Sequence, residues 1–376
     1  MQLSFRTHHL LRIFSLYETA SLPLDIFLSN YFRATKAIGS HDRKFLGDSV
    51  YNIIRWKGLI DYLCTKPITW QKRIEFYSTF SPEHHLSNPD IPDHSKVSFP
   101  KIYFDSLAHS FSNKETIEIC LTSNTTAPTT IRVNTLKTKR EILLKKWKNE
   151  FCISPCESAE HGIIFHKKIN FFTLPEFKEG LFEVQDEASQ LIADLVNAKP
   201  GEKILDFCSG SGGKTLAFAP KMNNKGLIYL HDVRSHPLEE ARKRLRRAGV
   251  QNSQFYLPDD PQLAKAKGHF DCVLADVPCS GSGTLRRNPD LKWKFHENTI
   301  KNLVSVQRKI CQKAISFLKP GGRFIYSTCS ILKEENREQL DYLTKDLSLE
   351  LVSEPFQSIP KKDKMDGFFG VILRKR

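Results

Sequence analysis

Two cysteines, Cys279 and Cys329, lie in polar turns that each follow a short apolar, β-branched run. Cys279 stands in DVPCSGSG and Cys329 in YSTCSIL, 50 residues further along the chain. A lone cysteine in a core usually packs as a small hydrophobic group, but serine and glycine neighbours at a strand end suit a nucleophile. Asp276 opens the first turn, where a substrate would bind. The two thiols therefore indicate covalent catalysis.

A glycine-rich segment, DFCSGSGGKT at 206–215, follows another such run and precedes an expected helix. Gly210, Gly212 and Gly213 allow a tight turn and a close approach of the backbone to a ligand, as a cofactor loop at a strand end requires. The GKT ending does not make it a Walker loop for a triphosphate, because that motif needs glycine where Cys208 stands.

Asp232 ends the next expected strand, 22 residues after Gly210. An acidic residue at about this spacing can accept a hydrogen bond from a ribose hydroxyl. The pair predicts a nucleoside cofactor. On spacing alone, a structural glycine turn with a capping aspartate remains the alternative.

Cysteine nucleophiles, a nucleoside cofactor and a basic chain together indicate chemistry on a pyrimidine base. C5 of cytosine is too weakly nucleophilic to attack a methyl sulfonium directly. Addition of a thiolate to C6 makes C5 enamine-like, so covalent catalysis solves this problem. A second group must then help to remove the C5 proton so that the thiolate leaves, and a second cysteine or its bound water can assist.

From Gly180 onward, short apolar runs alternate with longer helical stretches. This alternation predicts βαβ units and a mostly parallel sheet, whose ligands bind beyond the carboxyl ends of the strands. The expected strands are ILDF at 204–207, GLIYLHDV at 226–233, QFYL at 254–257, DCVLADV at 271–277 and GRFIYSTC at 322–329.

The part of the chain before these strands is expected to begin with helices. Residues 42–64 have the apolar periodicity of an amphipathic helix. Residues 81–100, with four prolines and three histidines, indicate a linker or long loop. A region that is helical near 102–121 and extended over 130–136 follows.

The charge balance points to a polyanionic partner. The 376 residues include 56 Lys and Arg against 42 Asp and Glu, a formal charge of +14 at pH 7. Such an excess favours nucleic acid before membrane, although on charge alone a basic surface that only keeps the chain soluble accounts for it equally well.

The nine cysteines are an odd number, and the chain shows no recognisable secretory signal or membrane span. We therefore expect a soluble, cytoplasmic monomer whose thiols are reduced. Cys152 and Cys156 lack the partners of a zinc site, and the histidines of 81–100 lack ligand spacing, so no metal is expected.

Four motifs together resemble the RsmB/Sun family of RNA cytosine-5 methyltransferases. They are DFCSGSGGKT at 206–215, DVPCSGSGTLRRNPDLKW at 276–293, YSTCSILKEEN at 326–336 and DGFFGVIL at 366–373. The resemblance extends upstream through FEVQDEASQL and IRVNTLK, so it covers roughly residues 100–376. The helices around 42–64 resemble the NusB-like RNA-binding domain of the bacterial 16S rRNA members.

This resemblance implies an α/β fold with three regions. A Rossmann-like class I methyltransferase core is expected over 181–376. A small α+β RNA-binding subdomain over 96–180 precedes it, and an all-α, NusB-like RNA-binding region occupies 1–95.

The resemblance also implies S-adenosyl-L-methionine as the cofactor. Asp232 is implied at its ribose, Asp259 of LPDDP near its adenine, with Asp260 as the alternative, and Asp276 where cofactor and substrate meet. The implied cofactor loop comprises Cys208, Ser209, Gly210, Ser211, Gly212, Gly213 and Lys214.

In the family that the motifs resemble, the cysteine of the TCS motif is the nucleophile and that of the PCS motif serves product release. Carried over, these roles fall on Cys329 and Cys279. The family loop usually reads CAAPGGK and here reads CSGSGGK. Ser211 thus replaces a rigid proline, which favours weaker rather than lost cofactor binding.

Arginine beside an aromatic residue suits phosphate contact and base stacking. The segment after Cys279 therefore supplies the expected RNA contacts, which are Arg286, Arg287, Lys292, Trp293 and Lys294. The run ARKRLRRAG at 241–249 is either a solvated helix face or a further RNA contact.

The expected function is S-adenosyl-L-methionine-dependent formation of 5-methylcytosine in RNA, with 16S rRNA as the partner and a Cys329–C6 adduct that Cys279 helps to release. The alternatives are a tRNA cytosine-5 methyltransferase, a DNA-type mechanism with Cys279 as the nucleophile, and a non-catalytic RNA-binding factor of ribosome assembly. A non-catalytic factor has no need of both thiols.

Overall fold

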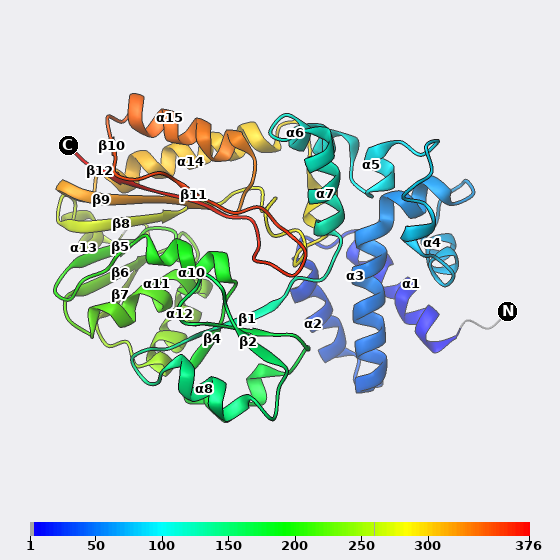
Figure 1. Ribbon diagram of the computed structural model, residues 1–376, viewed down its shortest axis with the longest axis horizontal. Helices are drawn as coiled ribbons and strands as arrows, with labels where there is room; N and C mark the ends of the chain where they lie inside the picture. Colours follow the sequence, from blue (N-terminus) through cyan, green and yellow to red (C-terminus); the bar gives the residue numbers. More distant parts are fainter. Residues whose placement is uncertain (1–3, 259) are drawn as a thin grey trace. The chain divides into compact units, whose positions relative to one another are not determined.

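The computed structural model describes residues 4–258 and 260–376, and its elements are labelled in Figure 1. The chain divides into two compact units. We call the first the helical unit; it comprises Met1–Thr126 and Thr284–Glu297. The second, the sheet unit, comprises Ala127–Gly283 and Asn298–Arg376. The segment after the DVPCSG motif thus belongs to the helical unit, although both of its neighbours in the chain belong to the sheet unit.

Amphipathic helices build the helical unit. In α3, Leu46, Val50 and Ile53 recur on one face and are fully buried, because residues three and four apart share a helix face. They pack in one apolar cluster with Ile13 and Phe14 of α1. The elements are α1 (Phe5–Tyr17), α2 (Leu24–Ala34), α3 (Ser40–Leu63), α4 (Trp70–Tyr77), η1 (Pro82–His84), α5 (Asp93–Lys96), α6 (Lys101–Ala108), α7 (Asn113–Ser123) and η4 (Leu291–Lys294).

Residues 81–100 are not the linker or long loop that the sequence indicated. They contain η1 and α5 and bury Ile91, Val97 and Phe99. Pro82 occupies the first turn of η1, where proline is tolerated because no hydrogen bond to its nitrogen is needed. The prolines here accompany short packed helices.

A buried lysine and a tryptophan hold the segment after the DVPCSG motif inside the helical unit. Lys292 Nζ donates hydrogen bonds to Arg55 O and Asn124 Oδ1, both at 2.7 Å, and 1% of the residue is exposed. The indole Nε1 of Trp293 donates to Ile54 O at 2.8 Å. A buried amine is costly without acceptors, so these acceptors fix where the segment lies.

The sheet unit begins with a small antiparallel sheet of strand order β2-β3-β1-β4. Its core is aromatic: Trp147 packs edge-on against Phe165 and Phe182, with ring centroids 5.7 and 5.5 Å apart. The elements are β1 (Thr129–Val133), α8 (Arg140–Trp147), β2 (Ile153–Pro155), β3 (Gly162–Phe165), η2 (Phe171–Thr173), α9 (Pro175–Lys178) and β4 (Phe182–Val184).

The second sheet has the order β10-β12-β9-β8-β5-β6-β7, with β11 paired to β12. The strands from β5 to β9 are parallel, and β12 is antiparallel to β9. Its strands are β5 (Lys203–Asp206), β6 (Leu227–His231), β7 (Ser253–Tyr256), β8 (Phe270–Asp276), β9 (Leu318–Thr328), β10 (Glu350–Leu351), β11 (Phe356–Gln357) and β12 (Phe369–Arg374). The helices are α10 (Glu187–Asp194), α11 (Gly213–Phe218), η3 (Ala219–Met222), α12 (Ser235–Ala248), α13 (Pro261–Lys265), α14 (Thr299–Ile315), η5 (Lys333–Glu335) and α15 (Arg337–Lys345).

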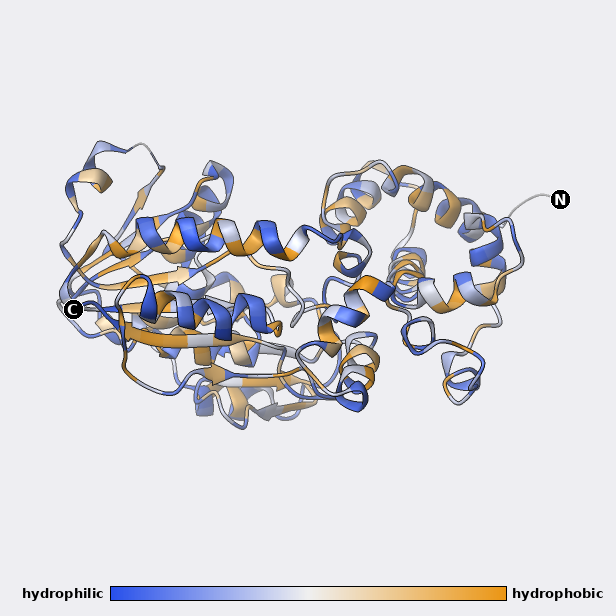
Figure 2. Cartoon of the chain, turned by 90° about the horizontal axis from the view of Figure 1, so that it is seen from above, coloured by the Kyte–Doolittle hydropathy of each residue, from blue (hydrophilic) through white to orange (hydrophobic). Residues whose placement is uncertain are grey.

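Helices cover both faces of this sheet, because successive side chains on a strand point to opposite faces. Leu205 packs in the cluster that includes α14 and α15, and its neighbour Ile204 packs in the cluster that includes α11 and α12. Figure 1 shows these helix pairs on opposite sides of the strands. The strands are largely hydrophobic, while the helices beside them carry hydrophilic and hydrophobic stretches (Figure 2).

The five strands expected from the sequence are present as β5 to β9, and the Rossmann-like core is confirmed. The expected domain boundaries differ from those of the two compact units in two places. Helices α6 and α7 lie in the helical unit rather than with the small sheet, where Asn124 Nδ2 donates to Val97 O at 2.7 Å. β4 at 182–184 completes the small sheet, past the expected boundary at 180.

Two features are absent from residues 4–258 and 260–376. No helix there has the length and apolar character needed to cross a membrane. No group of three or more His, Cys, Asp or Glu side chains in the same ranges is arranged to hold a metal ion.

Replacing the buried lysine tests whether it anchors its segment. Lys292→Ala should lower the free energy of unfolding by about 2–4 kcal/mol, because it leaves a cavity beside Phe99 and removes the donor to two buried acceptors. Urea unfolding measures the change. The control is Lys294→Ala, whose side chain is 44% exposed and paired with Asp290; it should cost at most about 1 kcal/mol. Equal losses of unfolding free energy in the two variants would contradict the role of Lys292 as the anchor of its segment.

Candidate active site

The carboxyl ends of β8 and β9 bring Cys279 and Cys329 into contact. The strands are parallel neighbours in a register that pairs Asp276 with Ser327, so the turns that follow them begin side by side. The two sulfur atoms lie 3.2 Å apart, and both cysteines are partly exposed. The structure thus joins the two thiols that the sequence singled out.

The two thiols differ in acidity because they share a hydrogen bond. The bond from Cys279 lowers the pKa of Cys329 and the charge of Lys214 adds to this, while burial and the Asp276 and Glu335 carboxylates oppose it. The same bond raises the pKa of Cys279 well above its ordinary value, together with burial and Glu335. Cys329 is therefore the more acidic thiol of the pair, and the thiolate is the reactive form of cysteine.

Asp276 and Lys214 connect the cysteine turns to the glycine-rich loop. Lys214 Nζ donates to Asp276 Oδ2, and Ser327 Oγ donates to Oδ1 at 3.0 Å. Lys214 is 8% exposed and lies 5.5 Å from the ring centroid of Phe368, which precedes β12. This partly buried ion pair and the bond from Ser327 thus join residues from α11, β8 and β9.

Backbone contacts lock the cysteine turns to the chain before β12. A Cβ on Gly283 would lie 2.0 Å from Gly367 O, so the approach requires glycine. Gly283 N donates to Cys329 O at 3.0 Å, and Gly367 N donates to Gly283 O at 2.9 Å. Backbone hydrogen bonds therefore join the segments that carry the DVPCSG, TCS and DGFFG motifs.

Glu335, which sequence reasoning did not single out, supports the Cys279 turn. It is fully buried and accepts hydrogen bonds from Ser280 N at 2.9 Å, Ser280 Oγ at 2.5 Å and Gln307 Nε2 at 2.9 Å. Its only signal was its place in YSTCSILKEEN. A buried carboxylate is expensive without donors, so this network fixes the turn.

The glycine-rich segment forms the turn between β5 and α11. Asp232, which follows β6, accepts hydrogen bonds from Gly210 N and from Arg234 N, both at 2.9 Å. Burial raises the pKa of Asp232, but the hydrogen bonds and charge of Arg234 and the bond from Gly210 leave it below its ordinary value. Gly212, with φ of 75°, begins α11 in the left-handed conformation that favours glycine.

Two buried polar atoms beside this turn fit a polar cofactor. Asp206 Oδ1 and Ser209 Oγ have no hydrogen-bond partner in the described parts of the chain, whereas Asp206 Oδ2 accepts a bond from Thr215 Oγ1 at 2.6 Å. Buried polar groups normally have partners. A nucleoside cofactor that carries hydroxyl and ammonium groups supplies them, and Asp232 offers the acceptor for a ribose.

The structure describes only one of the two LPDDP aspartates that were alternatives for the contact near the adenine. Asp259 lies outside the described residues. Asp260 Oδ1 accepts a hydrogen bond from Gln262 N at 2.8 Å and caps α13, so this oxygen is used within the helix cap.

Two of the five residues expected to contact RNA are buried, which corrects that expectation. Arg286 and Lys292 are each 1% exposed. Burial lowers the pKa of Lys292 well below its usual range, which does not suit a phosphate contact, and Trp293 bonds the backbone of α3. Of the remaining pair, Arg287 is partly exposed, and Lys294 is exposed and bonds Asp290 at 2.9 Å.

Comparison with known proteins was made on sequence and on structure. Residues 193–374 match the family described as 16S rRNA methyltransferase RsmB/F, and residues 99–171 match its ferredoxin-like domain. A probable ribosomal RNA small subunit methyltransferase B from Synechocystis is 30% identical over 301 residues, which are 74% of this chain and 67% of that protein. The chain belongs to the RsmB/F family.

Other similar proteins agree with this assignment. The mouse 28S rRNA (cytosine-C(5))-methyltransferase is 31% identical over 68% of this chain and 33% of its own length. A solved structure of a methyltransferase homolog protein from Pyrococcus horikoshii is 28% identical, with a TM-score of 0.67 over 79% of this chain and all of that one. The present chain spans only 60–61% of the length of relatives from Proteus mirabilis and two Vibrio species. The family resemblance drawn from the motifs is confirmed.

Alkylation as a function of pH tests the asymmetry of the two thiols. Since the pKa of Cys329 is lowered and that of Cys279 is raised, iodoacetamide should modify Cys329 first as the pH rises. Peptide mass spectrometry measures both rates. Cys279→Ala removes the hydrogen-bond donor and should shift the Cys329 profile to higher pH. Preferential modification of Cys279 would contradict the assignment.

Asp206 should make the fold sensitive to pH. Burial raises its pKa to about 7, against the opposing hydrogen bond of Thr215 and charge of Lys214. The folded chain therefore holds this proton more tightly than the unfolded chain, so the stability that Asp206 confers declines as the pH rises from ~4 to about 7.

Asp206→Asn should remove this decline. Relative to the unmodified chain, the variant should gain roughly 1–3 kcal/mol above pH ~7 and little below pH ~4. Thermal unfolding across this range measures the gain. Thr215→Val, which removes the donor to Asp206, is the comparison and should not stabilise the chain. A gain of Asp206→Asn that is independent of pH would contradict the raised pKa.

Proposed function

We propose that this chain is an S-adenosyl-L-methionine-dependent methyltransferase that forms 5-methylcytosine in 16S ribosomal RNA, as a cytoplasmic monomer. The observation that carries the proposal is the contact between two thiols of unequal acidity, Cys329 and Cys279, at 3.2 Å. The name of the Synechocystis relative gives the small ribosomal subunit, and that of the mouse relative gives C5 of cytosine.

Cys329 starts the reaction as the nucleophile. Its thiolate adds to C6 of a cytosine taken out of its stack, the sulfur–C6 bond forms, and electron density moves to C5. Asp276 is a carboxylate beside the thiols and a suitable acceptor for the exocyclic amino group of the base. The cofactor, when bound, supplies the methyl group that C5 takes.

Cys279 assists the release of the product. Water beside it accepts the C5 proton, the C5–C6 double bond forms again and the sulfur–C6 bond breaks. The Cys279 S–H, whose sulfur lies 3.2 Å from that of Cys329, then donates to the Cys329 thiolate as it leaves. Glu335 holds the Cys279 turn in place throughout.

Two alanine variants test these roles. Cys329→Ala should abolish methyl transfer and form no adduct. Cys279→Ala should accumulate a covalent protein–RNA species, because release slows while addition continues. Radiolabelled methyl transfer to 16S rRNA transcripts and denaturing gels give the two readouts, and the exposed Cys152, replaced by alanine, is the control. An exchange of the two results would make Cys279 the nucleophile.

Bisulfite sequencing of ribosomal and transfer RNA, from cells with and without the gene, identifies the substrate. Loss of a 5-methylcytosine from 16S rRNA is expected. Loss confined to tRNA would select the tRNA enzyme instead. RNA binding without any methyl transfer would indicate a ribosome-assembly factor.

A further inference from the structure

We propose that Arg244 is a positioning residue for the cofactor loop, and that Glu183 of the small sheet holds it in place. The inference rests on the proposed function, because the loop must bind S-adenosyl-L-methionine for the position of Ser211 to matter. It also gives part of the basic run at 241–249 a role other than contact with RNA.

Arg244 contacts the loop directly. From α12, its Nη1 donates to Ser211 O at 2.9 Å and to Ser211 Oγ at 2.8 Å. Its Nε and Nη2 donate to Glu183 Oε2 at 3.3 and 3.0 Å. The planar guanidinium thus bonds a loop residue with one nitrogen and a carboxylate with two others, a geometry that lysine cannot reproduce.

Glu183 is itself firmly held. It lies on β4, is 3% exposed, and its Oε1 accepts a hydrogen bond from Arg247 Nη2. Arg247 packs over the ring of Phe177, 4.0 Å from its centroid. A buried carboxylate between two guanidinium groups has little freedom to move, so it can orient Arg244.

The small sheet also reaches the helix that follows the loop. Gln185, next after β4, donates through Nε2 to Gly213 O at 3.2 Å. Arg132 of β1 is buried and donates through Nη1 to Leu216 O. The start of α11 and the loop before it are therefore bonded to the same pair of strands.

Ser211 needs an external restraint. It stands between Gly210 and Gly212, whose φ values are 51° and 75°, and glycine costs more conformational entropy to order than other residues. Proline at this position would restrict the backbone by itself, but Ser211 does not. The two bonds from Arg244 restrain its carbonyl and its hydroxyl instead.

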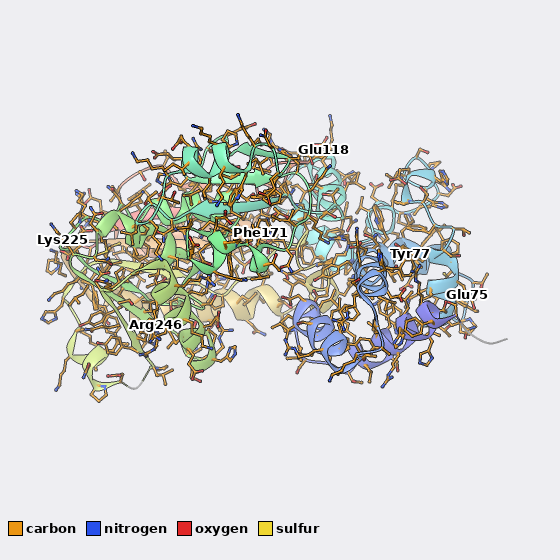
Figure 3. The ribbon with its side chains drawn as sticks, turned by 90° about the horizontal axis from the view of Figure 1, so that it is seen from below. Glu75, Tyr77, Glu118, Phe171, Lys225 and Arg246 are labelled. Atoms are coloured by element: carbon orange, nitrogen blue, oxygen red, sulfur yellow. The ribbon has the colours of Figure 1, made fainter. Side chains whose placement is uncertain are left out.

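The basic run thus has two faces. Arg244 and Arg247 are partly buried and bonded to Glu183. Lys243 and Arg246 are exposed; Arg246 is labelled in Figure 3. The same helix therefore supplies both the test residue and matched controls that carry the same charge.

Calorimetric titration of the full chain with S-adenosyl-L-methionine tests the inference. Arg244→Ala should weaken binding about tenfold or more, as expected for loss of charge-assisted hydrogen bonds. Ser211→Ala keeps the carbonyl contact and should weaken cofactor binding by roughly two- to fivefold. Arg246→Ala should stay within about twofold. In methylation assays, Arg244→Ala should raise KM for the cofactor and leave kcat at saturating cofactor within about twofold.

Arg247→Ala separates positioning from stability. It breaks the other bond to Glu183 without touching the loop, so it should lower the unfolding temperature but weaken cofactor binding less than Arg244→Ala does. Equal loss of affinity in Arg247→Ala and Arg244→Ala would overturn the inference, as would unchanged affinity in Arg244→Ala. If Arg244→Ala does not fold, Arg244→Lys and Ser211→Ala decide in the same way. Failure of the unmodified chain to bind S-adenosyl-L-methionine would instead overturn the proposed function and the inference together.

Discussion

The parallel pairing of β8 with β9 is the constraint on which the candidate site depends. Its register places Asp276 beside Ser327, and the turns after them then bring two sulfur atoms to 3.2 Å. A slip of one residue would turn every side chain of a strand to the other face. The core side chains of β8 and β9 prevent such a slip, because Val273 and Phe324 pack on one face of the sheet and Leu274 and Ile325 on the other. Packing far from the thiols therefore sets the chemistry between them.

Much of this arrangement could be predicted from local sequence. Apolar runs gave the central strands, and polar residues placed just after them gave Cys279, Cys329 and Asp232, because the carboxyl ends of parallel strands lie at one edge. Glu335 and Glu183 could not be found in this way. Whether a carboxylate is solvated or buried between specific donors depends on elements far apart in the chain. Glu183, for example, pairs with two arginines only because β4 packs beside α12. Lys292 was expected to contact RNA for the same reason. It stands in a basic and aromatic segment that suits RNA, but its side chain lies in the core of the helical unit.

The fold also shows that some of the chain's positive charges are used inside the protein. Lys214, Arg244 and Arg247 form ion pairs inside the protein, Lys214 with Asp276 and the two arginines with Glu183. Under the proposed function, contact with an RNA backbone would rely on the exposed cations that remain, whose interaction with phosphate is screened by salt. Part of the basic run at 241–249 is therefore used within the fold, while its exposed residues, Lys243 and Arg246 among them, add to the surface charge.

The helical unit is discontinuous in sequence, because the segment 284–297 belongs to it. The chain passes between the two units at three places, so the helical unit is not an appended module that recombination at one breakpoint could add or exchange. A shortened chain without its first 126 residues would keep Lys292 and Trp293 but lose Arg55, Asn124 and Ile54, their acceptors. The turn carrying Cys279 would then lead into a segment without its packing partners. Removal of the N-terminal helices would consequently also disturb the segment that follows the Cys279 turn.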